Sequence, residues 1–167
     1  MIKKATHIRP ARAEEKMVLA GLISESYLDV AERFGLTAEN CPKHPSNCTA
    51  SWIARDFDRG VKYYLFIHQD KAVGCVALEM ASQDLAYLER LAVLPGHRRR
   101  GFGRKLALHA LDLAQSNGAR TASVGIIAAQ EELKQWYLKL GFSENETRGF
   151  DHLPFMVTFM SHSFARR

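Results

Sequence analysis

Apolar positions along the first third of the chain change their spacing several times. A short strand is predicted over residues 6–11. Residues 14–34 carry apolar side chains at helical spacing, with an interruption near Glu25, which predicts two consecutive helices. Residues 35–51 follow no regular spacing, and residues 52–57 predict another short helix.

The middle of the chain has the pattern of β-strands. Residues 62–68 are rich in aromatic and branched side chains, and a polar turn follows over residues 69–71. Residues 73–80 form a second apolar run, so the two runs predict an antiparallel hairpin. A third run, residues 85–94, ends where Pro95 begins a turn.

The second half of the chain alternates between helical and strand patterns. A helix is predicted from Gly103, with Gly118 near its C-cap. A strand follows over residues 121–127, and then a helix over residues 131–140. Two further strand-like stretches lie near residues 144–148 and 155–159. This order predicts a layered α/β domain, in which a largely antiparallel meander leads into one strand–helix–strand crossover.

Composition and length place the chain among ordinary single-domain globular proteins. It has 167 residues, of which 47% are hydrophobic and 25% charged, and no repeat or linker divides residues 1–167. No apolar run approaches the length of a membrane span, and Met1–Lys4 lack the apolar stretch of a secretory signal. Three cysteines cannot all pair within the chain, which favours the reducing cytoplasm.

The net charge of +5 favours an acidic partner, and arginines gather in two places. One is Arg166-Arg167, and the other is the run Arg98 to Gly103 at the head of a predicted helix. Glycines there allow a tight turn, and the helix start offers unpaired N–H groups, so the segment predicts a phosphate or pyrophosphate site. The alternative is a solvated basic turn.

Three separated motifs carry a resemblance to a known family. They are Glu89-x-Leu91-x-Val93-x-Pro95, then Arg98-x-x-Gly101-x-Gly103, and then Trp136-Tyr137 followed by Gly141-Phe142. In this order they resemble the GCN5-related N-acetyltransferase (GNAT) superfamily. The chain departs from the usual pattern at Gln130, where an Asn is common, and at Leu133, where a small residue is common.

The resemblance implies a fold and a donor. The fold is a mixed, largely antiparallel twisted sheet of six to seven strands, flanked by about four helices. The donor is acetyl-CoA, bound with no metal, and the backbone of residues 91–93 would hold its pantetheine arm while the arginine–glycine turn would hold its pyrophosphate. The residues implied at the cofactor are Leu91, Ala92, Val93, Arg98, Arg99, Arg100, Gly101, Phe102, Gly103, Arg104, Gln130 and Tyr137.

The resemblance also implies direct acetyl transfer to a primary amine within a ternary complex. A protonated amine is not a nucleophile, so a base must take its proton, and Glu89 is the candidate. Strand alternation places Glu89 on the side of Leu91 and Val93, so its exposure to the cleft depends on a local bulge. The alternative is a carboxylate in a surface ion pair.

Tyr137 is the candidate acid that protonates the departing thiolate. The alternative is a tyrosine that only packs in the core. Cys75 lies in the middle of an apolar strand, which predicts a buried thiol rather than an acyl-carrying nucleophile.

The irregular segment contains Cys41, His44 and Cys48 at metal-like spacing. A zinc site would lack an evident fourth ligand unless His152 supplied it, so no metal is expected. The segment is instead predicted to form one wall of the acceptor pocket. His44, Ser46 and His152 are the candidate contacts to substrate.

Two other classes of function compete with acetyl transfer. One is an acyl-CoA-binding module without turnover, and the other is nucleic-acid binding through Arg98 to Arg100, although no aromatic residues are interleaved with that basic run. The acceptor is left open between small-molecule and peptide amines. A homodimer is also considered, with residues 153–160 forming an apolar edge strand that pairs between subunits.

Overall fold

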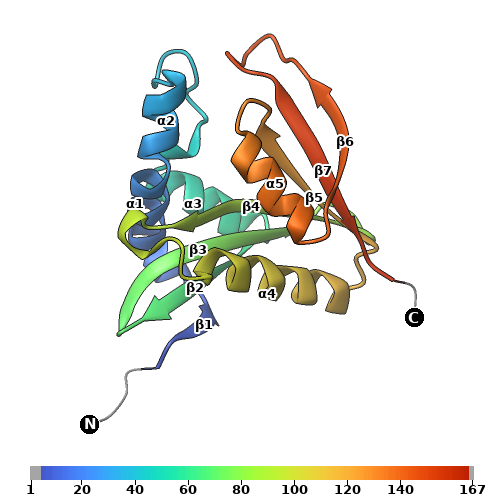
Figure 1. The fold of residues 1–167 in the computed structure, drawn as a ribbon. Coiled ribbons are helices and arrows are strands. Elements are labelled where there is room, and N and C mark those ends of the chain that lie inside the picture. The colour runs from blue at the N-terminus through green and yellow to red at the C-terminus, as the bar shows by residue number, and fades with distance from the viewer. Residues whose placement is uncertain (1–4, 166–167) are drawn as a thin grey trace.

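One seven-stranded sheet runs through the computed structural model, which describes residues 5–165 (Figure 1). The strand order is β1-β2-β3-β4-β5-β7-β6. Neighbouring strands are antiparallel except β4 and β5, which run parallel. The strands are β1 (His7–Pro10), β2 (Lys62–His68), β3 (Lys71–Met80), β4 (Leu85–Val93), β5 (Thr121–Ile127), β6 (Ser143–Arg148) and β7 (Val157–Ser163). The Met1–Lys4 and Arg166-Arg167 segments noted in the sequence lie outside the described residues.

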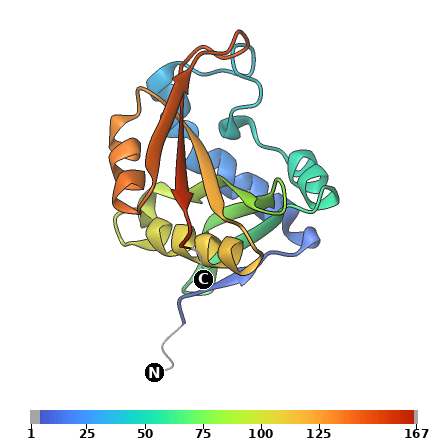
Figure 2. The ribbon, with the colours of Figure 1, turned by 90° about the vertical axis from the view of Figure 1, so that its right-hand side faces the viewer.

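Helices cover both faces of the sheet (Figures 1 and 2). The first layer packs on β3 and β4 through α1, with α3 beside it, and the second packs through α4 and α5. The helices are α1 (Lys16–Ser26), α2 (Leu28–Phe34), α3 (Ala50–Asp58), α4 (Phe102–Ser116) and α5 (Glu131–Lys139). Within the described part of the chain, no helix is long and apolar enough to cross a membrane.

Most predicted elements are confirmed, and so is the predicted fold class. The β2–β3 hairpin forms with the expected antiparallel pairing. Its turn places Gln69 and Asp70 at positive φ, the conformation of a two-residue hairpin turn. The predicted break in the first helical stretch falls at Tyr27, between α1 and α2.

One prediction about the sheet edge is wrong. Residues 153–160 were expected to form an edge strand that pairs between subunits. The structure places β7 inside the sheet, hydrogen-bonded to β5 on one side and to β6 on the other. β6 forms this edge of the sheet, and all its residues are exposed and mostly polar. Because both edges of β7 are already paired, this segment cannot supply the expected strand pairing.

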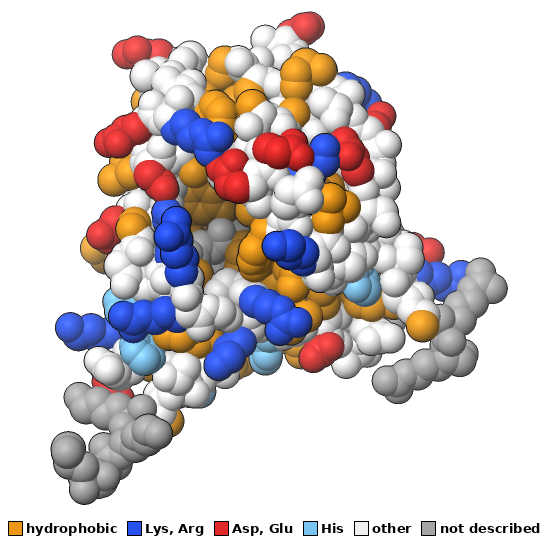
Figure 3. All heavy atoms as spheres, viewed as in Figure 1, with side chains coloured by type: hydrophobic (Ala, Val, Ile, Leu, Met, Phe, Trp, Pro, Cys, Tyr) orange, Lys and Arg blue, Asp and Glu red, His pale blue; other side chains and the backbone are white. Residues whose placement is uncertain are grey.

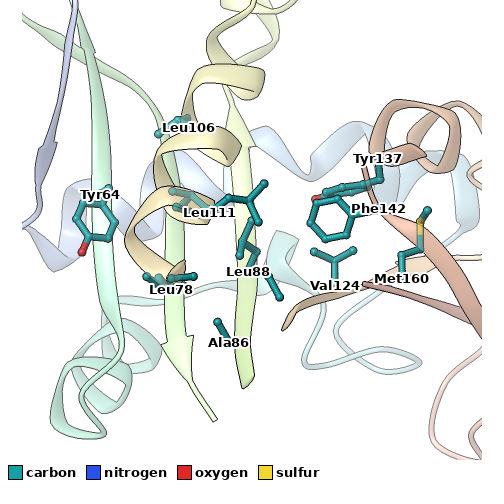
Figure 4. Close-up of a cluster of buried hydrophobic side chains, with 14 of the residues drawn as sticks. Tyr64, Leu78, Ala86, Leu88, Leu106, Leu111, Val124, Tyr137, Phe142 and Met160 are labelled. Carbon is teal, nitrogen blue, oxygen red and sulfur yellow. The ribbon is translucent and has the colours of Figure 1, made fainter. Parts of the chain in front are cut away.

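Two hydrophobic clusters hold the layers together. Between the sheet and α4 and α5, side chains such as Leu88, Leu106 and Met160 interlock (Figure 4). On the other face, Ile23 and Leu65 pack with α3. Adjacent residues of the central strands point into opposite clusters, so both faces of the sheet are buried there.

Candidate functional site

The parallel pair β4 and β5 separates partway along its length. The two strands are paired only where Leu85 to Tyr87 face Thr121 to Ser123. Beyond this point β4 continues to Val93 beside β3 alone. The backbone of its second half is therefore open on the β5 side, as a strand-like ligand requires.

A β-bulge in β4 decides which side chains face each side of this opening. Ala92 pairs with Cys75 and Glu89 pairs with Ala77, so β4 has one residue more than β3 over this stretch. The additional residue is Arg90, at φ +50°. The bulge reverses the alternation, so that Glu89 faces the α1–α3 side while Leu91 faces the α4 side. The bulge on which the exposure of Glu89 depended is thus present.

A pocket of about 520 Å³ opens on the α4–α5 side of β4. We call it the helix-face pocket. Figure 3 shows it as a hollow with a hydrophobic floor, with Lys and Arg side chains at its sides and acidic side chains along its upper rim. It is lined by Leu91, Val93, His97, Arg98, Arg99, Gly101, Phe102, Gly103, Arg104, Gln130, Glu132, Leu133 and Trp136. The predicted cofactor residues Ala92, Arg100 and Tyr137 are not among the residues that line it.

The N-terminus of α4 faces the helix-face pocket. Arg99 and Gly101 both have positive φ, at +62° and +79°, which curls the backbone before the helix. The N-cap residue, Gly101, has no side chain to cap the first turn, so its N–H groups are free to bind an anion. A Cβ on Gly103 would lie 3.7 Å from Trp136, and the missing side chain leaves the pocket open. These features fit a bound phosphate or pyrophosphate.

The arginines of the turn differ in their contacts. Arg98 donates to Asp29 at 2.6 Å, to the Ser26 carbonyl at 2.6 Å and to the Val93 carbonyl at 3.1 Å. It therefore ties the end of β4 to α1 and α2, and its guanidinium is engaged within the protein. Arg99 and Arg104 line the pocket, whereas Arg100 is exposed outside it. The predicted basic run is thus divided between structural support and the pocket.

Helix α2 also reaches the far side of the same pocket. Arg33 forms an ion pair with Glu132, which stands at the start of α5. Glu132 lines the helix-face pocket, and Arg33 also covers the Phe34 ring at 4.9 Å. Through Asp29 and Arg33, α2 is therefore bonded to both walls of the pocket.

Two phenols converge near the β4 bulge. The Tyr27 hydroxyl donates to the Leu91 carbonyl at 2.8 Å. Burial raises the pKa of Tyr27 well above its usual value, and the nearby Tyr137 phenol raises it further. The Tyr137 ring packs against Trp136 and Phe142, and its hydroxyl points toward β4 (Figure 4). Burial alone raises the pKa of Tyr137, so it holds its proton at neutral pH.

A second pocket, of about 410 Å³, lies over the exposed face of β4, β5 and β7. We call it the strand-face pocket. It is lined by Leu85, Tyr87, Leu88, Glu89, Thr121, Ser123, Val124, Gly125, Asn145, Phe159 and Ser161. Burial and a hydrogen bond to the Glu79 carboxyl raise the pKa of Glu89 to about 7. Glu89 is therefore poised to gain or lose a proton near neutral pH.

A charged network supports Arg90 at the bulge. The buried Asp56 accepts from Tyr63 at 2.5 Å and from Arg59 at 3.0 Å, and Arg90 forms an ion pair with it. Arg59 also binds Glu79 at 2.7 Å. The network therefore anchors the Arg90 side chain at the position where the bulge separates Glu89 from Leu91.

The residues predicted to contact the acceptor lie outside the strand-face pocket. His44 is buried, and its Nδ1 lies 2.8 Å from the Ser46 hydroxyl while its ring meets the edge of Tyr27. His152 is exposed beside Phe150. None of the three candidates lines the strand-face pocket. His44 and Ser46 are hydrogen-bonded to each other in the loop that packs behind Tyr27.

The cysteines are all free thiols, and Cys75 is fully buried as predicted. Burial raises the pKa of Cys75, which opposes thiolate chemistry there. Across residues 5–165, no group of three or more His, Cys, Asp or Glu side chains is arranged to hold a metal ion.

Several site residues escaped the sequence analysis. Tyr27 lies within the predicted helical stretch 14–34, and the interruption near Glu25 was the signal that could have found it. Tyr87 and Phe159 come together only through strand pairing across β5, which no local motif encodes. Trp136 was noted as part of a motif, and its contact with the pocket follows from the absent side chain at Gly103.

Family models and known protein sequences were compared with this chain. A family model described as the acetyltransferase (GNAT) family matches residues 25–142. A comparison with curated protein sequences finds no match.

Solved structures share this fold over nearly the whole chain. PaiA N-acetyltransferase from Thermoplasma acidophilum, in complex with coenzyme A, superposes with a TM-score of 0.79 at 17% identity, covering 96% of this chain and 99% of that chain. The ribosomal-protein-S18-alanine N-acetyltransferase from Escherichia coli gives 0.78 at 16% identity, covering 98% and 96%. A GNAT family acetyltransferase from Elizabethkingia anophelis with acetyl-CoA bound gives 0.71 at 14% identity, covering 97% and 100%. At these identities the likeness establishes the fold.

Proposed function

The chain belongs to the acetyltransferase (GNAT) family, and from this premise we propose that it transfers an acetyl group from acetyl-CoA to a primary amine in the cytoplasm. The observation that carries the proposal is the pair of pockets on opposite faces of β4, with the bulge at Arg90 between them. One pocket is built for an anionic, elongated ligand. The other holds a carboxyl group that changes its proton near neutral pH.

The helix-face pocket suits acetyl-CoA in several separate respects. The free N–H groups at the start of α4 match a pyrophosphate, and Arg99 and Arg104 add positive charge. The open edge of β4 at residues 91–93 offers backbone groups to the amides of a pantetheine arm. Coenzyme A or acetyl-CoA is present in solved structures of this fold. Acetyl-CoA supplies the activated thioester.

The strand-face pocket supplies the groups that handle the acceptor. The reaction is R–NH₃⁺ + acetyl-S-CoA → R–NH–CO–CH₃ + HS-CoA + H⁺. Glu89, ionised above its pKa of about 7, takes a proton from the ammonium and leaves a nucleophilic lone pair on nitrogen. The neutral amine nitrogen forms the C–N bond as the C–S bond breaks.

Tyr137 completes the proton balance on the thiolate. Its phenol holds its proton because burial raises its pKa, and its hydroxyl points toward β4. It donates that proton to the sulfur and regains one from solvent, while the nitrogen, cationic after the C–N bond has formed, loses its second proton to solvent. Glu89 then releases to solvent the proton that it took from the ammonium, so that one H⁺ is released overall. Tyr27 donates to the Leu91 carbonyl and so holds the backbone next to the bulge, where the thioester of acetyl-CoA would bind. No covalent enzyme intermediate is needed, in line with the buried and protonated Cys75.

The direct test follows free thiol while the protein is incubated with acetyl-CoA and a panel of primary amines. Thiol release that depends on the amine, with the N-acetylated product identified by mass spectrometry, is the expected result. Saturable coenzyme A binding with no amine-dependent thiol release would instead identify a binding module. Tyr137→Phe should lose turnover and keep coenzyme A binding, and Leu138→Ala, at an exposed position of the same helix, is its control.

A further inference from the structure

Glu89, the proposed base, is one member of a pair of glutamates. Glu79 on β3 lies opposite Tyr87 on β4, and Glu89 lies two residues further along β4. Opposite residues of an antiparallel pair share a face, and so do residues two apart on one strand, so both carboxyl groups lie on the same side of the sheet. They are in hydrogen-bonding contact, which requires a proton on one of the two groups.

The two carboxyl groups have different surroundings. Glu89 lines the strand-face pocket, whereas Glu79 lines a separate cavity of about 510 Å³ together with Arg59 and Lys62. Neither Glu79 nor Arg59 is among the residues that line the strand-face pocket. A ligand in that pocket therefore meets Glu89 directly, and Glu79 can influence the ligand only through Glu89.

Arg59 holds the second carboxyl group in place. From the C-cap of α3 its guanidinium donates to Glu79 at 2.7 Å and to Asp56 at 3.0 Å. A guanidinium keeps its positive charge in proteins, so this contact favours the ionised form of Glu79. The proton that the two glutamates share then lies on Glu89, which donates it in a hydrogen bond to the Glu79 anion.

A hydrogen bond of this kind makes Glu89 a stronger base. Burial disfavours the ionised form of Glu89, and the hydrogen bond to Glu79 stabilises the protonated form, so both raise the pKa of Glu89 to about 7. Of the other charged groups that face Glu89, Arg90 on β4 lowers this pKa and Asp56 on α3 raises it. A base with a pKa near neutrality takes a proton from an ammonium more readily than an ordinary carboxylate does.

We propose that Arg59 is a positioning residue for acetyl transfer, which holds Glu79 as an anion against Glu89 and so keeps the base strong. The inference rests on the proposed function in taking Glu89 as the base. When Glu89 takes a proton from the acceptor ammonium, its new O–H bond donates to the Glu79 carboxylate, and no proton has to pass to Glu79. A side chain of α3 that lines neither the helix-face pocket nor the strand-face pocket thereby contributes to the chemistry.

Titration of Glu89 in the intact protein tests the role of Arg59 without relying on turnover. Glutamate carboxyl groups labelled with carbon-13 are followed by NMR against pH, and the resonance that is absent from Glu89→Gln identifies Glu89. Arg59→Gln should lower the titration midpoint of Glu89 by about one pH unit, at the low end of the effect of an adjacent charge, because the released Glu79 side chain can turn away or take the proton itself. The pH midpoint of kcat should move in the same direction, with the KM for acetyl-CoA unchanged.

Matched variants separate the contact with Glu79 from a general loss of positive charge. Arg55→Gln removes an exposed arginine one turn earlier on α3 and should leave the midpoint unchanged. Arg59→Lys keeps a cation beside Glu79 and should retain most of the native midpoint. In the Glu79→Gln background, Arg59→Gln should cause no further shift, because Arg59 acts through Glu79. The Arg59 side chain is 54% exposed, so its replacement leaves no cavity in the core, and thermal melting checks that the variants fold.

The outcomes separate this inference from the proposed function. A midpoint that stays the same or rises in Arg59→Gln, or that shifts further in the Glu79→Gln background, overturns the role of Arg59. An equal fall in Arg59→Gln and Arg55→Gln overturns it as well, and amine-dependent thiol release would in each of these cases still uphold acetyl transfer. A midpoint that falls only in Arg59→Gln, without thiol release from any amine, supports the coupling of Arg59 to Glu89 and overturns the catalytic proposal.

Discussion

The two faces of β4 carry pockets that are built in different ways. The helix-face pocket depends on backbone: an uncapped helix start, a left-handed turn and an open strand edge. The strand-face pocket depends on side chains that several strands bring together, with Glu89 and Tyr87 from β4 and Phe159 from β7. Backbone groups recognise what is common to a class of ligand, whereas side chains can be exchanged without loss of the fold.

Because of this difference, single substitutions should change the strand-face pocket more easily than the helix-face pocket. The first turn of α4 can be altered only by changing the path of the chain. A substitution at Ser123 or Phe159 alters the strand-face pocket while the strand keeps its hydrogen bonds. Variants on each face should therefore affect one substrate and spare the other.

The largest expected effect is on the acceptor face. Glu89→Gln removes the base and keeps the shape of the side chain, so kcat should fall by about 10²-fold or more, the usual contribution of general base catalysis. Steady-state thiol release measures it, and the KM for acetyl-CoA should be unchanged because Glu89 does not line the helix-face pocket. Glu39→Gln, in an exposed turn, is the control. Full activity of Glu89→Gln would remove the carboxyl group from the mechanism.

On the donor face, Gly103→Leu should raise the dissociation constant of coenzyme A at least tenfold, because the new side chain enters the helix-face pocket beside Trp136. Calorimetry measures it. Gly21→Leu is the matched control, since Gly21 is an exposed helical glycine with open space around it. Weak coenzyme A binding in both variants would point to a general loss of structure instead.

The pH profile tests the link between Glu89 and Glu79. Glu89 must be ionised to act, and its pKa is raised to about 7, so kcat should fall about tenfold per pH unit below that value and level off above it. Glu79→Gln removes the hydrogen-bonded carboxyl neighbour and should move the midpoint to lower pH. The amine substrate titrates identically in both proteins, so the difference isolates Glu89. An unmoved midpoint would mean that another group controls the profile.

The smallest expected effect is at the mouth of the helix-face pocket. Arg33→Ala leaves the Glu132 carboxylate unpaired beside an anion site, and should raise the KM for acetyl-CoA about 3- to 5-fold at low salt. High salt should reduce the effect, since both side chains are largely exposed. The double variant Arg33→Ala/Glu132→Gln should restore the KM. Arg55→Ala, on α3 and outside the helix-face pocket, serves as the control, and failure of the double variant to recover would exclude the charge explanation.

Local features of the fold could be predicted from the sequence because their causes are local. Alternation and a polar turn were enough for the β2–β3 hairpin, and Gly101 and Gly103 before an amphipathic helix were enough for the tight turn at the start of α4. The requirement for a bulge near Glu89 could be deduced from alternation alone. Its position at Arg90 depends on the pairing of β4 with β3, where a Cβ on Gly74 would lie 2.9 Å from the Ala92 carbonyl.

Features that depend on distant segments could not be predicted in this way. The insertion of β7 between β5 and β6 is set by how the sheet is completed, and apolar residues at 153–160 are equally typical of an edge or an interior strand. The ion pair between Arg98 and Asp29 could not be predicted for the same reason, because a basic run has the same sequence pattern whether it binds a phosphate or a carboxylate. Contacts across more than 60 residues, such as that from Tyr27 to Leu91, leave no local pattern.

The additional residue in β4 has a kinetic consequence. Because the bulge turns Glu89 and Leu91 to opposite faces, the two pockets open on opposite sides of β4. With the function proposed above, donor and acceptor would enter from opposite sides, and neither would have to leave for the other to arrive. Encounter can then occur in either order, and an analogue of one substrate competes only with that substrate. The insertion of one amino acid in one strand would thereby turn a sheet, normally a barrier between two surfaces, into the meeting point of two independent diffusional paths.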